Sequence, residues 1–428
     1  MTLPTELQPR AIPELVSEYI SVTPKSRALH ERLSKSLAGG ETRVVTHFEP
    51  YPIAIASAEG PRLVDYDDNT YIDLVNNMAS LVHGHRYPPV VEAVAEAMQL
   101  LGTVQAGSHR YLVDFSELLV ERYPAFERVR FTNSASEAAI LALRIARRAT
   151  GREKLVIFDG AYHGMGSEFN DAHPNVVKVP FNQPTALADA VDETVGVVMV
   201  ESFLGHAGVV PPAPEFLHTV QNIAESAGAL FVLDETQSLR NDYHAHHGAA
   251  GLRPSMVIMG KSIGGGLPVG VLGGRADLVE LASASRPDGL RHSGTFNGNV
   301  LTTAAGFQAV VALSPSAIAT LNSRAAHLAQ QLEIEGRRLG LPISVTRSGS
   351  TMCVHFRDTA PTNAAEALAR NDFARWFHIA AMLEGVCTIR GGRLNLSTVL
   401  SDADMRTVEG ALCRALARLA EMDVADGC

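Results

Sequence analysis

Short apolar runs alternate with longer amphipathic stretches through the middle of the chain, from about Arg130 to Gly274. Such runs are typical of strands in a sheet covered on both faces, and the stretches between several of them have helical spacing. The predicted strands are Val129–Thr132, Lys154–Phe158, Val176–Val179, Gly196–Glu201, Leu230–Asp234, Met256–Met259 and Val269–Leu272. The clearest predicted helices are Ser136–Ala149 and Pro214–Ala227. This alternation predicts an α/β fold with a mostly parallel seven-stranded sheet and helices on both faces.

The flanking segments have a different pattern. RLVDYDDNTYIDLV (Arg62–Val75) predicts a hairpin with a polar turn at Asp67–Asn69, and a long helix is expected at Asn297–Leu313. Mixed helix and strand is expected over Ser323–Leu339, Ile343–Phe356, Ala364–Leu383 and Arg393–Leu396. SDAD at Ser401–Asp404 has the spacing of a capping box and predicts the start of a last helix.

Length and organisation together suggest one large and one small domain. The chain has 428 residues, which is enough for two domains. We expect residues 76–313 to form the large domain and residues 314–428 to form a small α+β domain. Residues 1–75 are expected to join the small domain.

Composition narrows the classes of function. Hydrophobic residues make up 46% of the chain, which allows a sizeable core, and the net charge of −10 argues against a general nucleic-acid-binding protein. No apolar run is long enough to span a bilayer, and the opening MTLPTELQPR lacks the pattern of a secretory signal. The cysteines have no CxxC spacing, so we expect reduced thiols in a cytoplasmic protein that binds neither nucleic acid nor membrane. These cysteines are Cys353, Cys387, Cys413 and Cys428.

Candidate chemistry begins at MVIMGKSIGGGLP (Met256–Pro268), where a lysine follows a predicted strand and three glycines come soon after. A lysine is rarely buried without a partner. Lys261 either points to solvent at the strand end or serves as a nucleophilic amine that forms a Schiff base. Gly264–Gly266 allow a sharp turn or a close approach to a bulky group.

Polar residues follow other predicted strands as well, and in open parallel sheets such positions gather at the ligand-binding edge. Asp234 ends an apolar strand, so it either pairs with a cation or stays partly solvated, and Gln237 after it can donate to an oxygen. Ser134 or Ser136 either caps a helix or leaves the helix N-terminus open to a phosphate. Tyr162 either stacks on a planar ligand or packs within its own turn.

Thr295, in HSGTFNGN (His292–Asn299), stands among small residues before a helix and is a further candidate for contact with an anion. Together these positions suit a planar, phosphorylated ligand that carries a cationic ring nitrogen and an aldehyde. Pyridoxal phosphate has all of these features, and enzymes pair its lysine Schiff base with an acidic partner of the pyridine nitrogen.

The motifs GGETR, HGH, FTNSASEA, AYHG, DETQS, GKSIGGGLPVG and GTFNGN lie between about Gly39 and Leu419. In them the chain resembles the class III aminotransferases of the pyridoxal-phosphate fold type I group. The resemblance is closest to the branch that contains glutamate-1-semialdehyde aminomutase and β-amino acid aminotransferases. It implies pyridoxal 5'-phosphate as cofactor, a small-molecule amino donor and a keto-acid acceptor. It also implies a homodimer with shared active sites, in which residues 1–75 contribute to the interface.

The resemblance implies roles for individual residues. Lys261 would carry the cofactor as a Schiff base until an amine substrate displaces it, and would then move a proton between substrate and cofactor. Asp234 would keep the pyridine nitrogen charged. Gln237 would sit near the ring hydroxyl, and Tyr162 would stack on the ring.

The same resemblance places the cofactor phosphate. The NSxSE turn would hold it through Ala135 and Ser136, and Thr295 would reach it across the dimer interface. Three positions depart from the family pattern: Ala135 stands where glycine is usual, Thr236 where valine is usual, and Tyr87 where histidine is common. These departures put the substrate in doubt more than the cofactor.

Two arginines are candidates for binding a substrate carboxylate. Arg43 follows a glycine pair in GGETR, and Arg390 lies in TIRGGRLNLS. The planar fork of arginine suits a carboxylate, whereas a solvated surface arginine is the alternative for each. The chain lacks the Ser- and Phe-Glu-containing segment of the aminomutases, which favours an intermolecular aminotransferase acting on a β-amino acid.

Other interpretations remain open at this stage. An aminomutase, a racemase or a decarboxylase would use the same lysine and acid, and a non-catalytic homologue would bind the cofactor alone. A nicotinamide enzyme would need a glycine fingerprint that opens a helix, whereas GKSIGGGLP begins with lysine and soon reaches Pro268. In YHAHH (Tyr243–His247), His244 and His247 hint at a metal, but no acidic or cysteine ligands cluster nearby, so we expect a polar loop and no metal.

Overall fold

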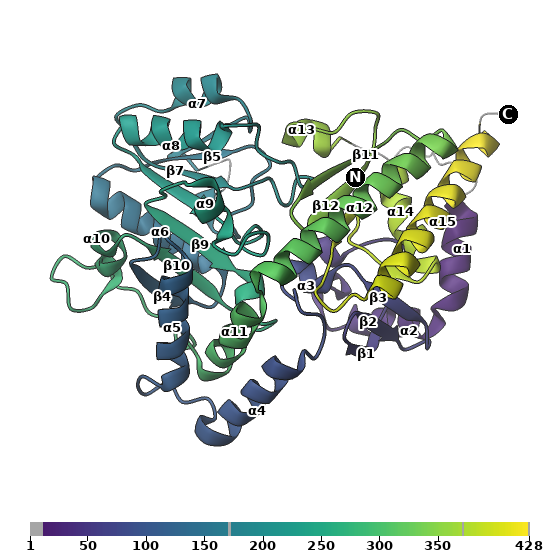
Figure 1. The fold of residues 1–428 in the computed structure, drawn as a ribbon, viewed down its shortest axis with the longest axis horizontal. Helices are drawn as coiled ribbons and strands as arrows, with labels where there is room; N and C mark the ends of the chain where they lie inside the picture. Colours follow the sequence, from purple (N-terminus) through teal and green to yellow (C-terminus); the bar gives the residue numbers. More distant parts are fainter. Residues whose placement is uncertain (1–11, 170–172, 370–371, 427–428) are drawn as a thin grey trace.

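Two lobes make up the folded chain (Figure 1). The computed structural model describes residues 12–169, 173–369 and 372–426. The segment MTLPTELQPR and Cys428 lie outside these residues, so the expectations for them stay predictions. The helices nearest the two ends, α1 (Ile12–Val22) and α15 (Asp402–Asp426), lie in the same lobe (Figure 1).

The larger lobe is built on a seven-stranded sheet. Its strands are β4 (Arg128–Thr132), β5 (Lys154–Phe158), β6 (Val176–Val179), β7 (Val195–Glu201), β8 (Leu230–Asp234), β9 (Met256–Gly260) and β10 (Gly270–Gly274). The order across the sheet is β4-β10-β9-β8-β7-β5-β6. Strand β10 runs antiparallel to its neighbours β4 and β9, and the other neighbours pair in parallel. The predicted mostly parallel α/β sheet is confirmed.

Helices cover both faces of this sheet, and successive strand residues point to opposite faces. Val232 of β8 packs in the apolar cluster that includes α6 (Ala135–Thr150). Leu233 packs in the cluster that includes α8 (Phe216–Ser226). The alternation therefore places Asp234, at the end of β8, on the α6 side of the sheet.

Six further helices surround the large sheet. They are α4 (Pro88–Leu101), α5 (Arg110–Arg122), α7 (Pro184–Ala190), α9 (Ala245–Ala250), α10 (Ala276–Val279) and α11 (Val300–Ala312). The helix predicted at Asn297–Leu313 is α11, which packs against α4 and α5. The side chain of Asn299 begins it by accepting a hydrogen bond from the N–H of Thr302 at 2.9 Å.

The smaller lobe contains two sheets with the orders β1-β2-β3-β13 and β11-β12-β14. Their strands are β1 (Ile55–Glu59), β2 (Arg62–Asp65), β3 (Thr70–Asp73), β11 (Ile343–Ser348), β12 (Thr351–Phe356), β13 (Val386–Cys387) and β14 (Arg393–Asn395). Strand β13 pairs in parallel with β3, and Val386 lies opposite Ile72. This pairing joins the two ends of the chain in one sheet.

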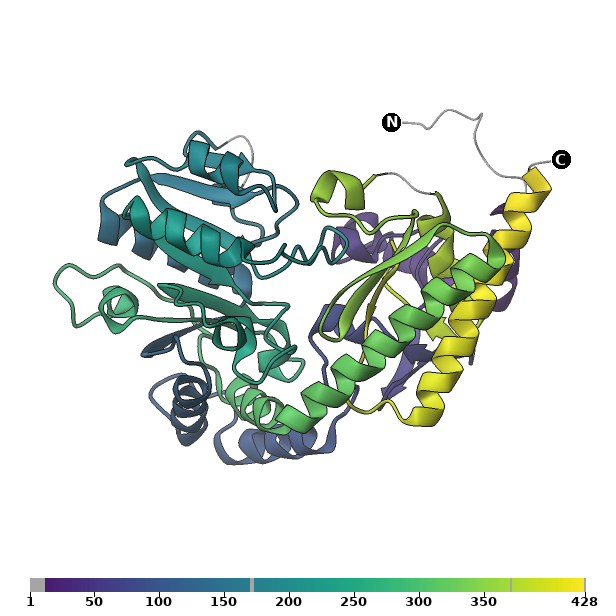
Figure 2. The same ribbon diagram turned by 45° about the horizontal axis from the view of Figure 1, so that its top comes forward.

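Helices pack on the small sheets, and one predicted boundary was wrong. The helices of this part of the chain are α1, α2 (Pro24–Leu33), α3 (Asn76–Ala79), α12 (Pro315–Leu339), α13 (Ala364–Ala367), α14 (Asp372–Leu383) and α15. Of these, α13 packs against the large lobe, because Ala364 lies in its apolar cluster. Helix α12 begins well before the predicted Ser323, because Ser314 caps it by accepting from the N–H of Ala317 at 3.2 Å and proline occupies its first position. The stretch Ala364–Leu383, which was expected to belong to a mix of helix and strand, contains the two helices α13 and α14. Figure 2 shows α12 running beside α15 along the small lobe.

The last predicted helix start is confirmed. The N–H of Ser401 donates to Oδ2 of Asp404 at 2.9 Å, and the N–H of Asp404 donates to Oγ of Ser401 at 3.1 Å. This reciprocal pair is a capping box at the beginning of α15.

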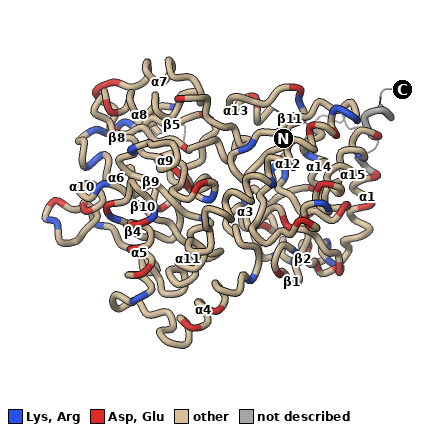
Figure 3. Tube along the Cα trace, viewed as in Figure 1, with Lys and Arg blue, Asp and Glu red and all other residues tan. Residues whose placement is uncertain are grey.

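The distribution of charge and the hydropathy of the helices can be compared with the expectations from composition. Residues of both signs are interspersed over the two lobes (Figure 3). In residues 12–169, 173–369 and 372–426, no single helix has the length and apolar character to cross a membrane. The bent pair α11 and α12, which meet at 73°, passes that test only when the two helices are taken together.

The histidine-rich segment Tyr243–His247 was expected to form a polar loop, and this expectation is wrong. The segment leads into α9, and His247 is fully buried with its Nδ1 2.6 Å from Oε1 of Glu235. Glu235 also accepts from the backbone N–H groups of His246 and His247 at 2.6 and 2.8 Å. A buried carboxylate needs such donors, and the start of α9 supplies them. Among the described residues, no group of three or more His, Cys, Asp or Glu is placed to bind a metal.

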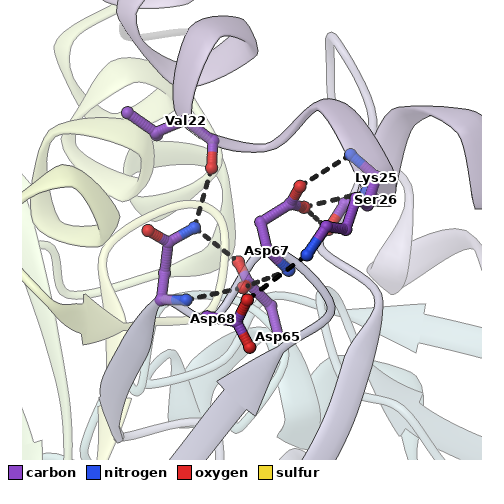
Figure 4. A network of polar contacts seen from close by, with 7 residues as sticks. Val22, Lys25, Ser26, Asp65, Asp67 and Asp68 are labelled. Carbon is purple, nitrogen blue, oxygen red and sulfur yellow. Dashed lines mark hydrogen bonds and ion pairs between the residues drawn. The ribbon is translucent and has the colours of Figure 1, made fainter.

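The polar turn predicted at Asp67–Asn69 joins β2 to β3 and also fixes α2 (Figure 4). The carboxylate of Asp67 accepts from the N–H groups of Lys25 and Ser26 at 2.6 and 2.9 Å. It also accepts from the hydroxyl of Ser26 at 2.8 Å. Asp67 thus caps the first turn of a helix that is remote in sequence, since Thr23 supplies no side-chain cap.

Replacing Asp67 with alanine should destabilise the small lobe. Removing a helix cap costs about 0.5–2 kcal/mol of unfolding free energy. The control Asp68→Asn removes an exposed ion pair to Lys25 and keeps a residue that tolerates the left-handed backbone at φ +69°, so it should cost less than about 1 kcal/mol. Partial burial would raise the pKa of Asp67, but the hydrogen bonds from Lys25 and Ser26 lower it overall. A depressed pKa means that the stabilisation is present above the unfolded-state pKa and is lost as the pH falls. Denaturant unfolding followed by circular dichroism at neutral and acidic pH measures both effects. Equal stabilities of wild type and Asp67→Ala at neutral pH would contradict the capping role.

Candidate active site

Two carboxylates and a lysine meet at the carboxyl edge of the large sheet. Glu201 ends β7 and lies opposite Asp234, which ends β8, and Asp234 lies opposite Ile258 of β9. Lys261 follows β9 directly. Because these parallel strands end at the same edge, strand order alone brings the three side chains together.

Asp234 is buried and is held from two directions. Its Oδ2 lies 2.9 Å from Nδ1 of His163, and its Oδ1 accepts from the backbone N–H of Thr236 at 3.0 Å. Burial by itself would raise the pKa of Asp234, but the contacts with His163 and Thr236 outweigh burial and keep the pKa below its ordinary value. Asp234 is therefore a fixed negative charge in a dry part of the site.

Glu201 is the second buried carboxylate. It accepts from the backbone N–H of Tyr162 at 3.1 Å and from Nε2 of Gln237 at 3.4 Å. Burial raises the pKa of Glu201, and the neighbouring charge of Asp234 raises it further, although His163 opposes the rise. The two carboxyl groups thus have pKa values pushed in opposite directions, as in sites where two acids take different roles.

Lys261 turns away from the strand in a left-handed backbone conformation, with φ +50°. Such a conformation is strained for a residue with a side chain and is held by the structure around it. Burial lowers the pKa of Lys261, and the cation of Arg393 lowers it further, while Asp234 and Glu201 act in the opposite direction. A lowered pKa increases the share of free amine near neutral pH, which is the form that acts as a nucleophile.

The first turn of α6 lies against the turn that follows β5. Ser134 caps this helix by accepting from the N–H of Glu137 at 3.2 Å. Ala135 and Ser136 are then the first helical residues, and their N–H groups have no acceptor within the helix. Gly164, at φ +108°, is so close that a Cβ there would come within 2.3 Å of Oγ of Ser136. A helix start with free N–H groups beside a glycine turn suits a phosphate.

Two of the three positions that depart from the family pattern, Ala135 and Thr236, are near this edge. A Cβ on Gly260 would lie 3.0 Å from the methyl group of Ala135, so the start of α6 lies beside the end of β9. Oγ1 of Thr236 is buried, and no partner for it lies among the residues that the structure describes. Tyr87 is farther away and stacks on His83 with ring centroids 4.8 Å apart.

A cavity of about 1060 Å³ opens above Lys261, and its walls come from both lobes. Arg43 and Arg390 of the small lobe line it together with Lys261 and Tyr162 of the large lobe. Arg390 donates to the backbone carbonyl of His47 at 3.2 Å. The ring of Tyr162 is 40% exposed and lies 4.3 Å, between centroids, from the ring of His206. The structure thus brings the predicted lysine, tyrosine and both predicted arginines to one cavity.

Among the predicted site residues, Ala135, Ser136, Asp234 and Gln237 lie at the sheet edge and do not line this cavity, and neither does Thr295. The loop of Thr295 is exposed, and Phe296 next to it is 60% exposed. The same loop is anchored beside the start of α6, because Nδ2 of Asn133 donates to Oδ1 of Asn297 at 2.9 Å. Thr295 therefore lies on the surface near the turn that suits a phosphate, and its role stays a prediction.

Three residues of the site were not predicted from the sequence. Glu201 carries the same signal as Asp234, an acid at the end of an apolar predicted strand, so the sequence contained a pattern that could have identified Glu201. His163 is adjacent to Tyr162 in AYHG, but nothing local indicates that it contacts Asp234. Arg393 comes from the small lobe, and no sequence pattern connects it with this edge.

The chemistry of these groups fits pyridoxal phosphate. The start of α6 offers N–H groups for a phosphate, and Asp234 is a fixed anion for a cationic ring nitrogen. The amine of Lys261 is the group that an aldehyde requires. All three lie at one edge of one sheet.

Comparison with known proteins gives the same result. Residues 45–416 match the family model described as class III aminotransferase. The chain is 34% identical to a β-phenylalanine transaminase from Variovorax paradoxus, over 92% of this chain and 93% of that protein. It is also 34% identical to a glutamate-1-semialdehyde 2,1-aminomutase from Anaeromyxobacter dehalogenans, over 91% of this chain and 97% of that protein.

A solved structure agrees with the sequence comparisons. The crystal structure of the β-phenylalanine aminotransferase from Variovorax paradoxus superposes with a TM-score of 0.90, at 30% identity and with 98% of each chain covered. The fold is that of the fold type I enzymes that use pyridoxal phosphate. The chain belongs to the class III aminotransferases, and its cofactor is pyridoxal 5'-phosphate.

Proposed function

We propose that this protein is an aminotransferase that moves an amino group between a β-amino acid and a keto acid. The observation that carries the proposal is the cavity above Lys261, where Arg43 and Arg390 face the lysine from the small lobe. In the described part of the chain no carboxylate pairs with either arginine. A guanidinium fork without an acidic partner suits a substrate carboxylate. The similarity to a β-phenylalanine transaminase supports the same substrate class.

Individual residues of the chain have separate roles in the proposed reaction. The bound cofactor supplies an electron sink for the charge left when a proton leaves the substrate carbon. The amine of Lys261 holds the cofactor and, once free, carries that proton at Nζ. Asp234 holds the positive charge of the ring nitrogen, and Gln237 donates to the ring oxygen.

The remaining residues bind and orient. The N–H groups of Ala135 and Ser136 hold the phosphate, and Tyr162 covers one flat face of the ring. Thr295 completes the phosphate site of the partner subunit, so the active enzyme is a homodimer. Arg43 and Arg390 hold the carboxylate so that the amine of the substrate reaches Lys261.

An aminomutase is the second candidate, because aminomutases are among the relatives at similar identity. It would use the same lysine and acid but would return the amino group to the same molecule. The two candidates differ in their need for a second substrate. Turnover that requires both an amino donor and a keto acid supports the aminotransferase, whereas turnover of one amino aldehyde without any keto acid supports the aminomutase.

Lys261→Ala should abolish transamination and leave the fold intact. The variant loses both the nucleophile and the proton carrier, and proton transfer alone contributes about 10²–10⁴-fold to the rate. The measurement is kcat of the purified variant, with circular dichroism to check the fold and Lys35→Ala, an exposed lysine of the small lobe, as the control. Transamination by Lys261→Ala at a rate near that of the wild type would overturn its assignment.

A mixed dimer tests the shared active site. Lys261→Ala and Thr295→Glu chains are each expected to form inactive homodimers, the second because an added carboxylate repels the phosphate. A mixed dimer has one site with an intact Lys261 and an intact Thr295 from the partner subunit, so activity should return when the two chains are co-expressed and the mixed dimer is purified. An inactive mixed dimer would place Thr295 in the site of its own chain, and an active Thr295→Glu homodimer would place it in no site.

Arg43→Ala should weaken only those substrates that carry a carboxylate. A charge-assisted bidentate contact contributes about 1.5–3 kcal/mol, so kcat/KM for a β-amino acid should fall by roughly 10- to 150-fold. The decarboxylated amine never uses the contact and should be unaffected. Arg32→Ala, an exposed arginine on α2, is the control. An equal loss on both substrates would mean that Arg43 supports the fold or the cofactor, and no loss on either would return it to the solvated surface.

A further inference from the structure

Arg393 reaches the carboxyl edge of the large sheet from the other lobe. It is the first residue of β14 and is 8% exposed. Its Nη1 donates to the backbone carbonyl of Gly205 at 3.1 Å, and its Nη2 donates to Oε1 of Gln237. Gly205 follows β7 and Gln237 follows β8, so one guanidinium joins two loops of the large lobe to a strand of the small lobe.

The packing at these two loops is tight. A Cβ on Gly205 would lie 1.8 Å from Nε2 of Gln237, so a side chain at this position would displace the amide from the place that it takes here. Because Oε1 of Gln237 accepts from Arg393, its Nε2 is directed at Oε1 of Glu201, at 3.4 Å. The amide has one orientation that satisfies both neighbours, and the arginine selects it.

Arg393 has no carboxylate partner among the described residues, and its Nε is buried without an acceptor. A buried cation is costly unless it is paired or fully hydrogen-bonded. Its two contacts are with neutral oxygens. Stabilisation of the small lobe therefore does not explain why Arg393 is buried here. Its hydrogen bonds are made to the loops of the large lobe, one of which carries Gln237.

We propose that Arg393 is a positioning residue for the cofactor site. Its guanidinium holds the amide of Gln237 in the orientation that contacts the cofactor. This orientation therefore depends on how the small lobe packs against the large lobe. The inference rests on the proposed role of Gln237 at the ring oxygen. It does not depend on which amine is the substrate. When the small lobe is displaced, β14 moves with it, and Gln237 loses the contact that orients it.

The charge of Arg393 gives a second, separate effect. Lys261 and Arg393 line the same cavity, and the cation of Arg393 adds to burial in lowering the pKa of Lys261. Removing the cation stabilises the protonated amine, so the pKa of Lys261 should rise. A lysine in place of Arg393 keeps the charge but has no planar fork. The variants Arg393→Gln and Arg393→Lys therefore separate charge from geometry.

A double-mutant cycle tests the geometry without measuring turnover. The readout is the dissociation constant of pyridoxal 5'-phosphate from the cofactor-free enzyme, for Arg393→Lys, Gln237→Leu and the double variant. Each single variant should raise this dissociation constant roughly 2- to 12-fold, which corresponds to the free energy of one hydrogen bond. If Arg393 acts through Gln237, the double variant should be no weaker than the worse single variant. Losses that multiply would overturn the proposal.

The pH dependence of Lys261 acylation in the cofactor-free protein tests the charge. Competitive labelling with acetic anhydride, read by mass spectrometry, gives the midpoint pH for that one lysine. The midpoint should move to higher pH in Arg393→Gln and should stay near the wild-type value in Arg393→Lys. Arg347→Lys, an exposed arginine of β11 in the same small sheet, is the control for both measurements and should change neither. A Lys261 midpoint that does not move in folded Arg393→Gln would count against the proposal.

One further pattern would also overturn it. If the Arg393 variants keep the wild-type cofactor affinity and Lys261 midpoint but raise KM for carboxylate substrates alone, Arg393 binds substrate and does not position Gln237. Failure of the β-amino acid assignment leaves the cofactor affinity and the Lys261 midpoint unchanged, because neither measurement requires a turned-over substrate. The two proposals therefore fail separately.

Discussion

Two buried carboxylates, Glu201 and Asp234, lie at one edge of one sheet beside Lys261, which lines the cavity. Each would be costly there alone. Asp234 is stabilised by His163 and by the N–H of Thr236, and Glu201 takes donors from Tyr162 and Gln237. The negative charges of Asp234 and Glu201 raise the pKa of Lys261, against the lowering by burial and by Arg393. The turns after β5, β7 and β8 take the positions that supply these partners, so the burial of charge at this edge determines the local structure around it.

Neither lobe contains the whole site. The large sheet supplies the lysine, the acids and the helix start, whereas the small lobe supplies the arginines that line the cavity. Strand β13 pairs with β3, which fixes the small lobe from both ends of the chain. Arg393 then connects that lobe to the loops after β7 and β8. Substrate recognition and cofactor binding are therefore linked through the packing of the two lobes.

The sequence predicted what depends on short-range pattern. Buried parallel strands are continuous apolar runs, so all seven strands of the large sheet were found, and the residues that follow them were placed at one edge. The contact between Glu235 and His247 was missed because it joins the end of a strand to helix α9, whose polar sequence resembles that of a loop. The early start of α12 depends on Ser314 and Pro315, a local signal that was present but not used. Arg393 could not be found at all, since its partners are more than a hundred residues away in sequence and in the other lobe.

The central claim is that Lys261 carries the cofactor at this edge. Borohydride reduction of the enzyme loaded with pyridoxal 5'-phosphate, followed by proteolysis and mass spectrometry, tests it most directly, because reduction fixes the cofactor to the lysine that holds it. The account predicts a pyridoxyl label on the peptide that contains Lys261 and a loss of visible absorbance in proportion. A label on another lysine, or a loaded enzyme that reduction leaves unlabelled, would contradict it.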